Sequence, residues 1–378
     1  MAAAQDAIIA FAEEKLGAIE ARNLYRRLRP TARGSLMRAE REGRALVSFS
    51  DNDYLGLSAD PRVKQAAAQA ALDHGAGAGA SRLVTGDCPL YADLEARLAA
   101  MKGTEAALVF GSGYLANVSA IPVLARPGDH ILLDALSHAC MHAGARLSGA
   151  FVETFRHNDV EDLRARLAAS AAPRKLVLTE TVFSMDGDLA PLDLIAGACA
   201  DHDAWLMTDD AHGFGVVAAD NPAPVQMGTL SKAVGSYGGY VCGPRALIEL
   251  LVNRARGLIF TTGLPPAALG ASIEALRIIE AEPERRERVL AYATRFSRAL
   301  DAPPAESAIV PVILGSEERA LSASTRLADK GLLVAAIRPP TVPPGTARLR
   351  VSFSSEHRLE DVEALGAATS EILSEMET

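Results

Sequence analysis

The stretch TLSKAVGSYGGY, residues 229–240, decides how the rest of the sequence is interpreted. It places Lys232 between the small residues Ser231 and Ala233, in a run rich in glycine and serine. Glycine lets the backbone approach a flat ligand closely, and a lysine amine can condense with an aldehyde to form a Schiff base. A lone lysine in a glycine-rich turn is more often a surface residue, so the interpretation depends on other stretches.

Two upstream stretches favour the functional interpretation. LMTDDAHGFG, residues 206–215, ends an apolar run at Asp209, and TETVFSMDGD, residues 179–188, precedes it. Pyridoxal-phosphate (PLP) enzymes use an acidic partner for the pyridine nitrogen and a Schiff-base lysine. A strand ending in Asp, followed by a strand ending near Thr and Lys, is the order typical of these enzymes. Asp209 would keep the ring nitrogen protonated, because a carboxylate stabilises a neighbouring cation.

Composition limits the class of protein. The 378 residues, 49% hydrophobic and 22% charged, predict a globular chain with one large and one smaller domain. The formal net charge of −9 argues against nucleic acid and anionic membranes as partners. No apolar run approaches the roughly 20 residues of a membrane span. Acidic residues occupy the N-terminal segment where a signal peptide would be apolar, and the cysteines show no CxxC spacing. We therefore expect a cytoplasmic protein.

Short apolar runs alternate with helix-like segments from residue 105 onward. The runs span residues 106–110, 130–135, 151–155, 175–180, 204–209, 225–229, 239–243 and 258–262. Strands that are buried on both faces show such continuous apolar runs. We therefore expect an α/β fold with a largely parallel sheet and helices on both faces. Ligands bind beyond the carboxyl ends of such strands. The predicted division is an N-terminal helix and arm (1–45), a large domain (46–270) and a small C-terminal α+β domain (271–378).

FGSGYLANVSA, residues 110–120, supplies a candidate phosphate site. It places Ser112, Gly113 and Tyr114 between a predicted strand and a predicted helix. The free N–H groups and the dipole at a helix start attract anions. Beside Asp209 and Lys232, this stretch becomes a credible site for a cofactor phosphate.

A metal site is the competing interpretation of the same polar residues. Asp209, Asp210 and His212 could bind a divalent ion, and His138 and His142 have the i,i+4 spacing that suits zinc. Neither group has a further ligand at suitable spacing, so we predict no metal.

Six motifs together resemble the α-oxoamine synthases, which are fold-type-I PLP enzymes. They are NDYLG (52–56), ASRLVTG (80–86), SHA (137–139), VFSMDGD (182–188), DDAHG (209–213) and TLSKAVG (229–235). They occur in the expected order and cover nearly the whole chain. The resemblance implies a transferase with a seven-stranded-type sheet, PLP as its cofactor and a homodimer with shared active sites.

The resemblance also implies roles for individual residues. Lys232 resembles the Schiff-base lysine, Asp209 the pyridinium partner, and His138 the residue that stacks on the ring. The other implied cofactor contacts are Ser184 and His212 at the ring hydroxyl, Gly113, Tyr114 and Thr229 in the cofactor loop and at the phosphate, and Thr262 of the neighbouring subunit, also at the phosphate.

The implied substrates are an amino acid and an acyl thioester. Asn52 and Arg350 resemble the groups that bind the amino-acid carboxylate, and Arg26 and Thr341 resemble residues around the acyl chain. AIRPPTVPPGTARLR, residues 336–350, resembles the branch of the family that serves biotin synthesis. Its prolines would hold Arg338 and Thr341 near the entrance. This branch condenses L-alanine with a pimeloyl thioester, either pimeloyl-CoA or pimeloyl-carrier protein, and His138 assists with the acyl substrate.

Three alternatives stay open. A sister synthase would use glycine or serine with another acyl-CoA, a PLP-dependent lyase or aldolase would need no thioester, and a binding protein would not catalyse at all. The intact Lys232 argues against the last alternative. One departure from the family pattern is Tyr91, where relatives usually have histidine.

Overall fold

A seven-stranded sheet forms the centre of the larger part of the computed structural model, which describes residues 2–21, 24–218 and 220–377. The strand order is β4-β10-β9-β8-β7-β5-β6. The strands are β4 (Ala106–Phe110), β5 (His130–Asp134), β6 (Phe151–Phe155), β7 (Lys175–Glu180), β8 (Ala204–Asp209), β9 (Val225–Thr229) and β10 (Gly239–Gly243). Seven of the predicted apolar runs are therefore confirmed as strands. Strands β5 to β9 pair in parallel, whereas β10 is antiparallel to both of its neighbours.

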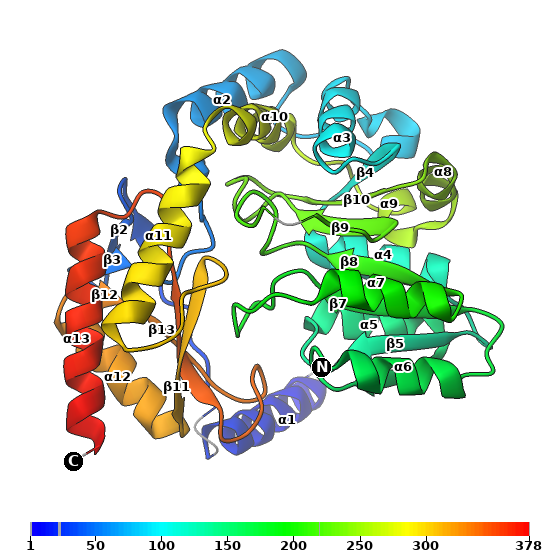
Figure 1. Cartoon of the computed structure of the whole chain (residues 1–378). Coiled ribbons are helices and arrows are strands. Elements are labelled where there is room, and N and C mark those ends of the chain that lie inside the picture. The colour runs from blue at the N-terminus through cyan, green and yellow to red at the C-terminus, as the bar shows by residue number, and fades with distance from the viewer. Residues whose placement is uncertain (1, 22–23, 219, 378) are drawn as a thin grey trace.

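Helices cover both faces of this sheet, as expected for buried parallel strands (Figure 1). On one face, α4 (Gly113–Leu124), α5 (Ala139–Ser148) and α8 (Arg245–Arg254) enclose an apolar core with the strands. On the other face, α6 (Val160–Ala169) and α7 (Leu192–Asp201) pack beside β5, β7 and β8. Near β4 and β10, α3 (Leu90–Met101), α2 (Pro61–His74) and α10 (Pro266–Ala281) complete the covering layer.

The predicted strand at residues 258–262 is wrong. The chain there forms the short helix α9 (Arg256–Ile259), and Thr262 makes only an isolated bridge to Ser81. The reason is packing against α4. A Cβ built on Gly257 would lie 2.1 Å from Oγ of Ser119 and 2.5 Å from Leu115, so the backbone itself fits against that helix. An apolar run of this length can serve a helix or a strand, and tertiary contact decides between them.

The C-terminal part is built on two small sheets. Strands β11 (Ile309–Gly315), β14 (Ala347–Ser352) and β13 (Ala335–Ile337) form one antiparallel sheet. The other has the order β1-β2-β3-β12, from β1 (Ala32–Arg33), β2 (Arg38–Arg41), β3 (Arg44–Ser48) and β12 (Leu332–Leu333). Because β3 pairs with β12, the segment that follows β3 lies beside the C-terminal part. Helices α11 (Glu284–Ala299), α12 (Glu317–Asp329) and α13 (Leu359–Glu377) pack around these sheets.

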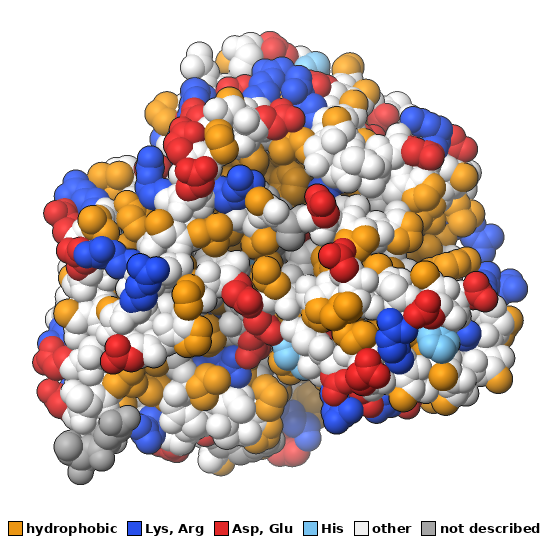
Figure 2. Space-filling model, viewed as in Figure 1, with side chains coloured by type: hydrophobic (Ala, Val, Ile, Leu, Met, Phe, Trp, Pro, Cys, Tyr) orange, Lys and Arg blue, Asp and Glu red, His pale blue; other side chains and the backbone are white. Residues whose placement is uncertain are grey.

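The surface mixes charges of both signs. Figure 2 shows acidic, basic and apolar side chains interspersed over the face turned to the viewer. The N-terminal helix α1 (Ala2–Glu20) carries exposed apolar side chains, including Ile8, Phe11 and Leu16. Among the helices of the described ranges, none has both the length and the apolar character to cross a membrane.

Candidate active site

The carboxyl ends of three neighbouring strands bring the central acidic and basic residues together. In the register of the sheet, Glu180 at the end of β7 lies beside Asp209 at the end of β8, and Asp209 lies beside Met227 of β9. Strand β9 ends two residues later at Thr229, and the turn that carries Lys232 begins there. The predicted location of the site beyond the strand ends is therefore where these side chains lie.

Lys232 lies in a tight turn that closes over the strand ends. The N–H of Gly235 donates to the carbonyl oxygen of Lys232 at 2.8 Å. Gly235 has φ +69°, and a Cβ there would lie 2.3 Å from the backbone nitrogen of Ser58, so only glycine fits. Burial lowers the pKa of the Lys232 amine, against the opposing effects of Asp209 and Glu180. A larger share of the amine is therefore neutral and able to act as a nucleophile or base.

Asp209 is a buried carboxyl group that has hydrogen-bond donors but no cationic partner. Asn117 donates from Nδ2 to Oδ2 at 2.8 Å, and the N–H of Ala211 donates to Oδ1 at 2.9 Å. Within the residues that the structure describes, no basic side chain lies within ion-pair distance of Asp209. Burial raises the pKa of Asp209, and Lys232 opposes that rise. Such a carboxyl group fits a ligand that brings its own cation, as a protonated pyridine ring does.

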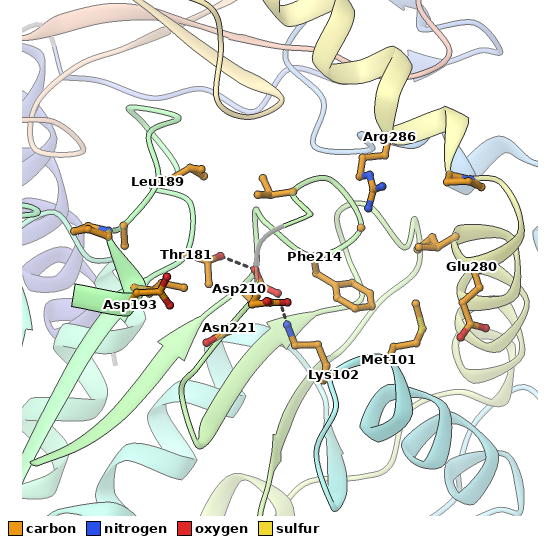
Figure 3. A pocket seen from close by; sticks show the side chains of 18 of the residues that line it. Met101, Lys102, Thr181, Leu189, Asp193, Asp210, Phe214, Asn221, Glu280 and Arg286 are labelled. Carbon is orange, nitrogen blue, oxygen red and sulfur yellow. Dashed lines mark hydrogen bonds and ion pairs between the residues drawn. The ribbon is translucent and has the colours of Figure 1, made fainter. Parts of the chain in front are cut away.

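Asp210 faces the other way and is already neutralised. Nζ of Lys102 lies 2.6 Å from one carboxylate oxygen of Asp210, and Thr181 donates to the other at 2.5 Å. These residues line a separate cavity of about 720 Å³, in which Phe214 and Arg286 also lie (Figure 3). Asp209, and not Asp210, therefore faces the side of Lys232.

The described part of the chain contains no cluster of three or more His, Cys, Asp or Glu residues that could hold a metal ion.

The start of α4 and the end of β9 form the candidate phosphate site. Ser112 caps α4 by accepting a hydrogen bond from the N–H of Leu115 at 3.1 Å. A Cβ on Gly113 would lie 3.3 Å from Cβ of Thr229, and a Cβ on Gly239 would lie 2.5 Å from the nitrogen of Gly113. Glycines thus let the ends of β9 and β10 pack closely against this helix start, whose free N–H groups and dipole suit a phosphate group.

Two further residues predicted for the phosphate site lie on the surface of the chain. Tyr114, the second residue of α4, is exposed. Thr262 is exposed as well, and its backbone pairs with Ser81.

His138 lies at the start of α5, close enough to Asp209 and Lys232 to feel their charges. It begins α5, where its Nδ1 accepts from the N–H of Cys140 at 3.3 Å. Its own N–H donates to Oε1 of Glu180 at 2.5 Å. Burial lowers the pKa of the His138 ring, Asp209 opposes that change and Lys232 adds to it. Glu180, which the sequence analysis assigned no role, therefore holds the segment that carries this ring.

Arg350 is another buried residue of the site, and its guanidinium donates hydrogen bonds to three acceptors. Its Nε donates to the carbonyl oxygen of Ser184 at 2.5 Å, and its Nη1 donates to Oδ1 of Asn52 at 3.1 Å. Its Nη2 donates to the hydroxyl of Tyr54 at 3.2 Å. The Tyr54 hydroxyl also lies 2.6 Å from Nδ1 of His212. The structure thus brings together four predicted residues, and it adds Tyr54, which the prediction missed.

Arg348 and Arg350 both lie in β14 and are both buried, yet their surroundings differ. Arg348 forms an ion pair with Asp186 at 2.5 Å and donates to the carbonyl oxygens of Met185 and Thr346. Arg350 has no carboxylate partner among the described residues. A guanidinium without an acidic partner is the better anchor for a substrate carboxylate.

Arg350→Lys is therefore expected to raise the KM for the amino acid at least about tenfold, because an ammonium cannot reproduce a two-pronged grip. The matched variant Arg348→Lys is expected to lower the melting temperature, since it weakens the Asp186 ion pair, while changing that KM much less. Steady-state kinetics and thermal unfolding of both variants provide the measurements. A larger rise in KM at Arg348 would reverse the assignment.

The residues predicted for the acyl substrate lie farther out. Arg26 and Arg338 line one groove of about 950 Å³ between the N-terminal segment and β12–β13. Thr341 follows in an exposed turn, where its N–H donates to the carbonyl oxygen of Arg338 at 3.1 Å. The wall of this groove adjoins Arg350, because Ala335 of β13 pairs with that residue.

Tyr91 has a structural task in this chain. Its hydroxyl accepts a hydrogen bond from the N–H of Leu264 at 2.6 Å, and its ring lies 3.7 Å from the guanidinium of Arg82. The residue at this position therefore fastens the segment that contains Thr262.

The aminotransferase class I and II family matches residues 44–368 of this chain. A relative from Methylobacterium radiotolerans, named 8-amino-7-oxononanoate synthase, is 61% identical over 365 residues, which cover 96% of this chain and 98% of the relative. A solved serine palmitoyltransferase with PLP has a TM-score of 0.88 and 32% identity, with 91% of this chain and 92% of that chain covered. A solved 8-amino-7-oxononanoate synthase from Francisella tularensis has a TM-score of 0.76 and 25% identity, with coverages of 88% and 99%.

These comparisons confirm the resemblance to the α-oxoamine synthases, the fold-type-I architecture and PLP as the cofactor. The chain therefore belongs to the 8-amino-7-oxononanoate synthases of biotin synthesis, PLP-dependent acyltransferases within the class I and II aminotransferase family.

Proposed function

We propose that this chain condenses L-alanine with a pimeloyl thioester, releasing carbon dioxide and the thiol carrier, to give 8-amino-7-oxononanoate. The observation that carries the proposal is the combination of a buried amine, Lys232, with a nearby guanidinium, Arg350, that lacks a carboxylate partner among the described residues. An amine beside a carboxylate anchor suits an α-amino acid, which presents its Cα between the two groups.

The chain's own residues divide the work as follows. PLP, when bound, supplies an aldehyde for Lys232 and a ring that withdraws electrons from the substrate. Lys232 holds the cofactor covalently, and once free it takes the proton from Cα of alanine, for which its lowered pKa suits it. Asp209 keeps the ring nitrogen protonated, and His138 stacks on the ring and orients it.

The remaining cofactor contacts fix the ring and the phosphate. Ser184 and His212 hydrogen-bond the ring hydroxyl. Ser112, Gly113, Tyr114 and Thr229 hold the phosphate, together with Thr262 of the partner subunit. The close packing of the start of α4 against the buried Thr229 supports this placement.

The acyl substrate enters through the groove that contains Arg26 and Arg338. These cations attract the carboxylate, or its ester, at the far end of a pimeloyl chain, and Thr341 lines the turn beside them. His138 assists the acyl transfer, and the effect of Lys232 on the pKa of His138 supports a role for both side chains in one site.

We further propose a cytoplasmic homodimer in which each chain comprises residues 1–45, 46–270 and 271–378 as separate units. The exposed apolar side chains of α1 support an intermolecular contact. The described cysteines are all free, which suits a reducing compartment. The sheet of β11, β14 and β13 lies wholly within residues 271–378 and supports the last unit, whereas the pairing of β3 with β12 joins the N-terminal segment to it.

The test is thiol release from pimeloyl-CoA in the presence of alanine, glycine or serine. We expect release that depends on both substrates, is fastest with alanine and is matched by equal carbon dioxide. Release without an amino acid would indicate a simple thioesterase and would contradict the proposal.

The sister-synthase alternative has its own support, because the likeness in structure to serine palmitoyltransferase is strong. Preference for serine or glycine in the same assay would favour it. Membership of the acyltransferase family disfavours the lyase, aldolase and binding-protein alternatives.

A further inference from the structure

A continuous hydrogen-bonded chain connects the proposed carboxylate anchor to the proposed ring-hydroxyl contact. It runs from Nη2 of Arg350 to the hydroxyl of Tyr54 at 3.2 Å and from that hydroxyl to Nδ1 of His212 at 2.6 Å. All three side chains are buried. They come from the segment after β3, the loop after β8 and strand β14, so the fold alone brings them together.

The chemistry of the three groups determines which of them donates in each hydrogen bond of this series. A guanidinium can only donate, so the oxygen of Tyr54 accepts from Arg350. The single proton of Tyr54 must then go to another acceptor. Nδ1 of His212 at 2.6 Å is nearer than Oδ1 of Asn52 at 3.1 Å. The shorter contact favours donation to Nδ1 of His212, and Oδ1 of Asn52 still accepts from Nη1 of Arg350.

Donation to Nδ1 determines which nitrogen of His212 carries a proton. Burial lowers the pKa of His212 well below its ordinary value, and Lys232, Arg350 and His138 lower it further. A buried imidazole beside these cationic groups is favoured in its neutral form. Because Nδ1 accepts a hydrogen bond, the proton of the neutral ring lies on Nε2. Nε2 has no partner among the described residues and is free to donate to a ligand.

The same contacts fix the plane of Arg350. Ser184, Asn52 and Tyr54 each take one N–H of the guanidinium. One N–H then remains on each terminal nitrogen, as a substrate carboxylate requires for two hydrogen bonds. Tyr54 thus contacts both functional groups at once.

We propose that Tyr54 is a positioning residue that holds His212 as an Nε2–H donor toward the ring hydroxyl and orients Arg350 toward the substrate carboxylate. The proposal rests on the function proposed above. The packing of Tyr54 does not depend on its hydroxyl, because its N–H donates to the carbonyl of Asn52 at 2.9 Å and its carbonyl accepts from Ser355 at 2.8 Å. Tyr54→Phe therefore removes the link and keeps the ring.

Tyr240 offers a matched control. Its side chain is fully buried, and its hydroxyl has no hydrogen-bond partner among the described residues. Tyr240→Phe deletes the same atom from the same kind of surroundings without breaking a hydrogen bond. It controls for the general effect of losing a buried hydroxyl.

The experiment titrates the visible absorbance of the wild-type, Tyr54→Phe and Tyr240→Phe holoenzymes with pH. A hydrogen bond from Nε2–H of His212 to the hydroxyl oxygen of the cofactor ring lowers the affinity of that oxygen for the proton that it shares with the Lys232 nitrogen. The midpoint of the absorbance titration is then lower than it would be without that hydrogen bond. Without Tyr54, His212 can shift its proton to Nδ1 and present a bare Nε2. We expect the midpoint of the Tyr54→Phe titration to rise by about one pH unit and the alanine KM to rise severalfold. The midpoint of Tyr240→Phe should stay at the wild-type value.

Equal midpoints in wild type and Tyr54→Phe, or equal rises in both variants, would overturn the inference. A second measurement needs no stable Tyr54 variant. Nitrogen NMR of ¹⁵N-histidine-labelled holoenzyme, with the His212 signals assigned by His212→Asn, should show Nδ1 of His212 without a proton. A protonated Nδ1 would also overturn it. If the wild type forms no visible chromophore, or turns over no substrate, the proposed function itself fails.

Discussion

Lys232→Ala should leave a protein that cannot be labelled by borohydride and whose kcat/KM is at least about a thousandfold below that of the wild type. Two tasks disappear together: covalent attachment of the cofactor and removal of the Cα proton, and loss of a general base alone costs roughly 10²–10⁴-fold. The buried position of this amine and its lowered pKa make it the candidate. Substrate turnover and borohydride labelling of each purified protein are the measurements.

The matched control is Lys64→Ala, which removes an exposed lysine from α2 and should change neither the rate nor the labelling. Borohydride reduction of the wild type followed by peptide mass mapping should place the cofactor on Lys232. An adduct on another lysine, or normal turnover by Lys232→Ala, would contradict the assignment.

The second large effect concerns the acyl chain, for which we expect a pimeloyl thioester to exceed an acetyl thioester by a hundredfold or more in kcat/KM. Each buried methylene contributes up to ~0.8 kcal/mol, and about 1.4 kcal/mol corresponds to a factor of ten, so four or five methylenes suffice. The measurement compares pimeloyl, succinyl, acetyl and palmitoyl thioesters at saturating alanine.

The arginines of the outer groove supply the control for this preference. Arg26→Ala should lower kcat/KM for the pimeloyl thioester more than for the palmitoyl thioester, because only the former ends in a carboxylate. Arg298→Ala, an exposed change at the end of α11 outside that groove, should affect both equally little. A preference for acetyl or succinyl would identify a sister synthase and leave the role of Lys232 intact.

The parts of the site that could be predicted lie at strand ends. A parallel sheet places the ends of successive strands along one edge, so the positions of Asp209 and Lys232 follow from the apolar runs before them. The contacts of Asn117 and Tyr54 cannot be obtained in this way. Asn117 meets Asp209 across 92 positions of the chain, and Tyr54 meets Arg350 across 296. Asn117 and Tyr54 are buried polar residues, and the role of each depends on a contact partner that is distant in the sequence.

Residues 258–262 show a different failure, in which the sequence pattern predicts the wrong type of secondary structure. Their apolar pattern fits a strand, but Gly257 allows close packing on α4 and the chain turns helical. Alternation of side chains also fails to separate Arg348 from Arg350, because both face the loop that contains Ser184 and Asp186. Their partners distinguish them, because Arg348 forms an ion pair with Asp186 whereas Arg350 contacts the neutral side chains of Asn52 and Tyr54.

The burial of Asp209 without an ion-pair partner among the described residues implies that bound PLP stabilises the folded protein. Burial of its carboxyl group lowers the free energy of unfolding, and a bound ligand that brings a cation raises it. Chains made while vitamin B6 is scarce would therefore unfold more often and be degraded sooner than chains that acquire PLP as they fold. The supply of one vitamin would in this way set the abundance of an enzyme that makes another.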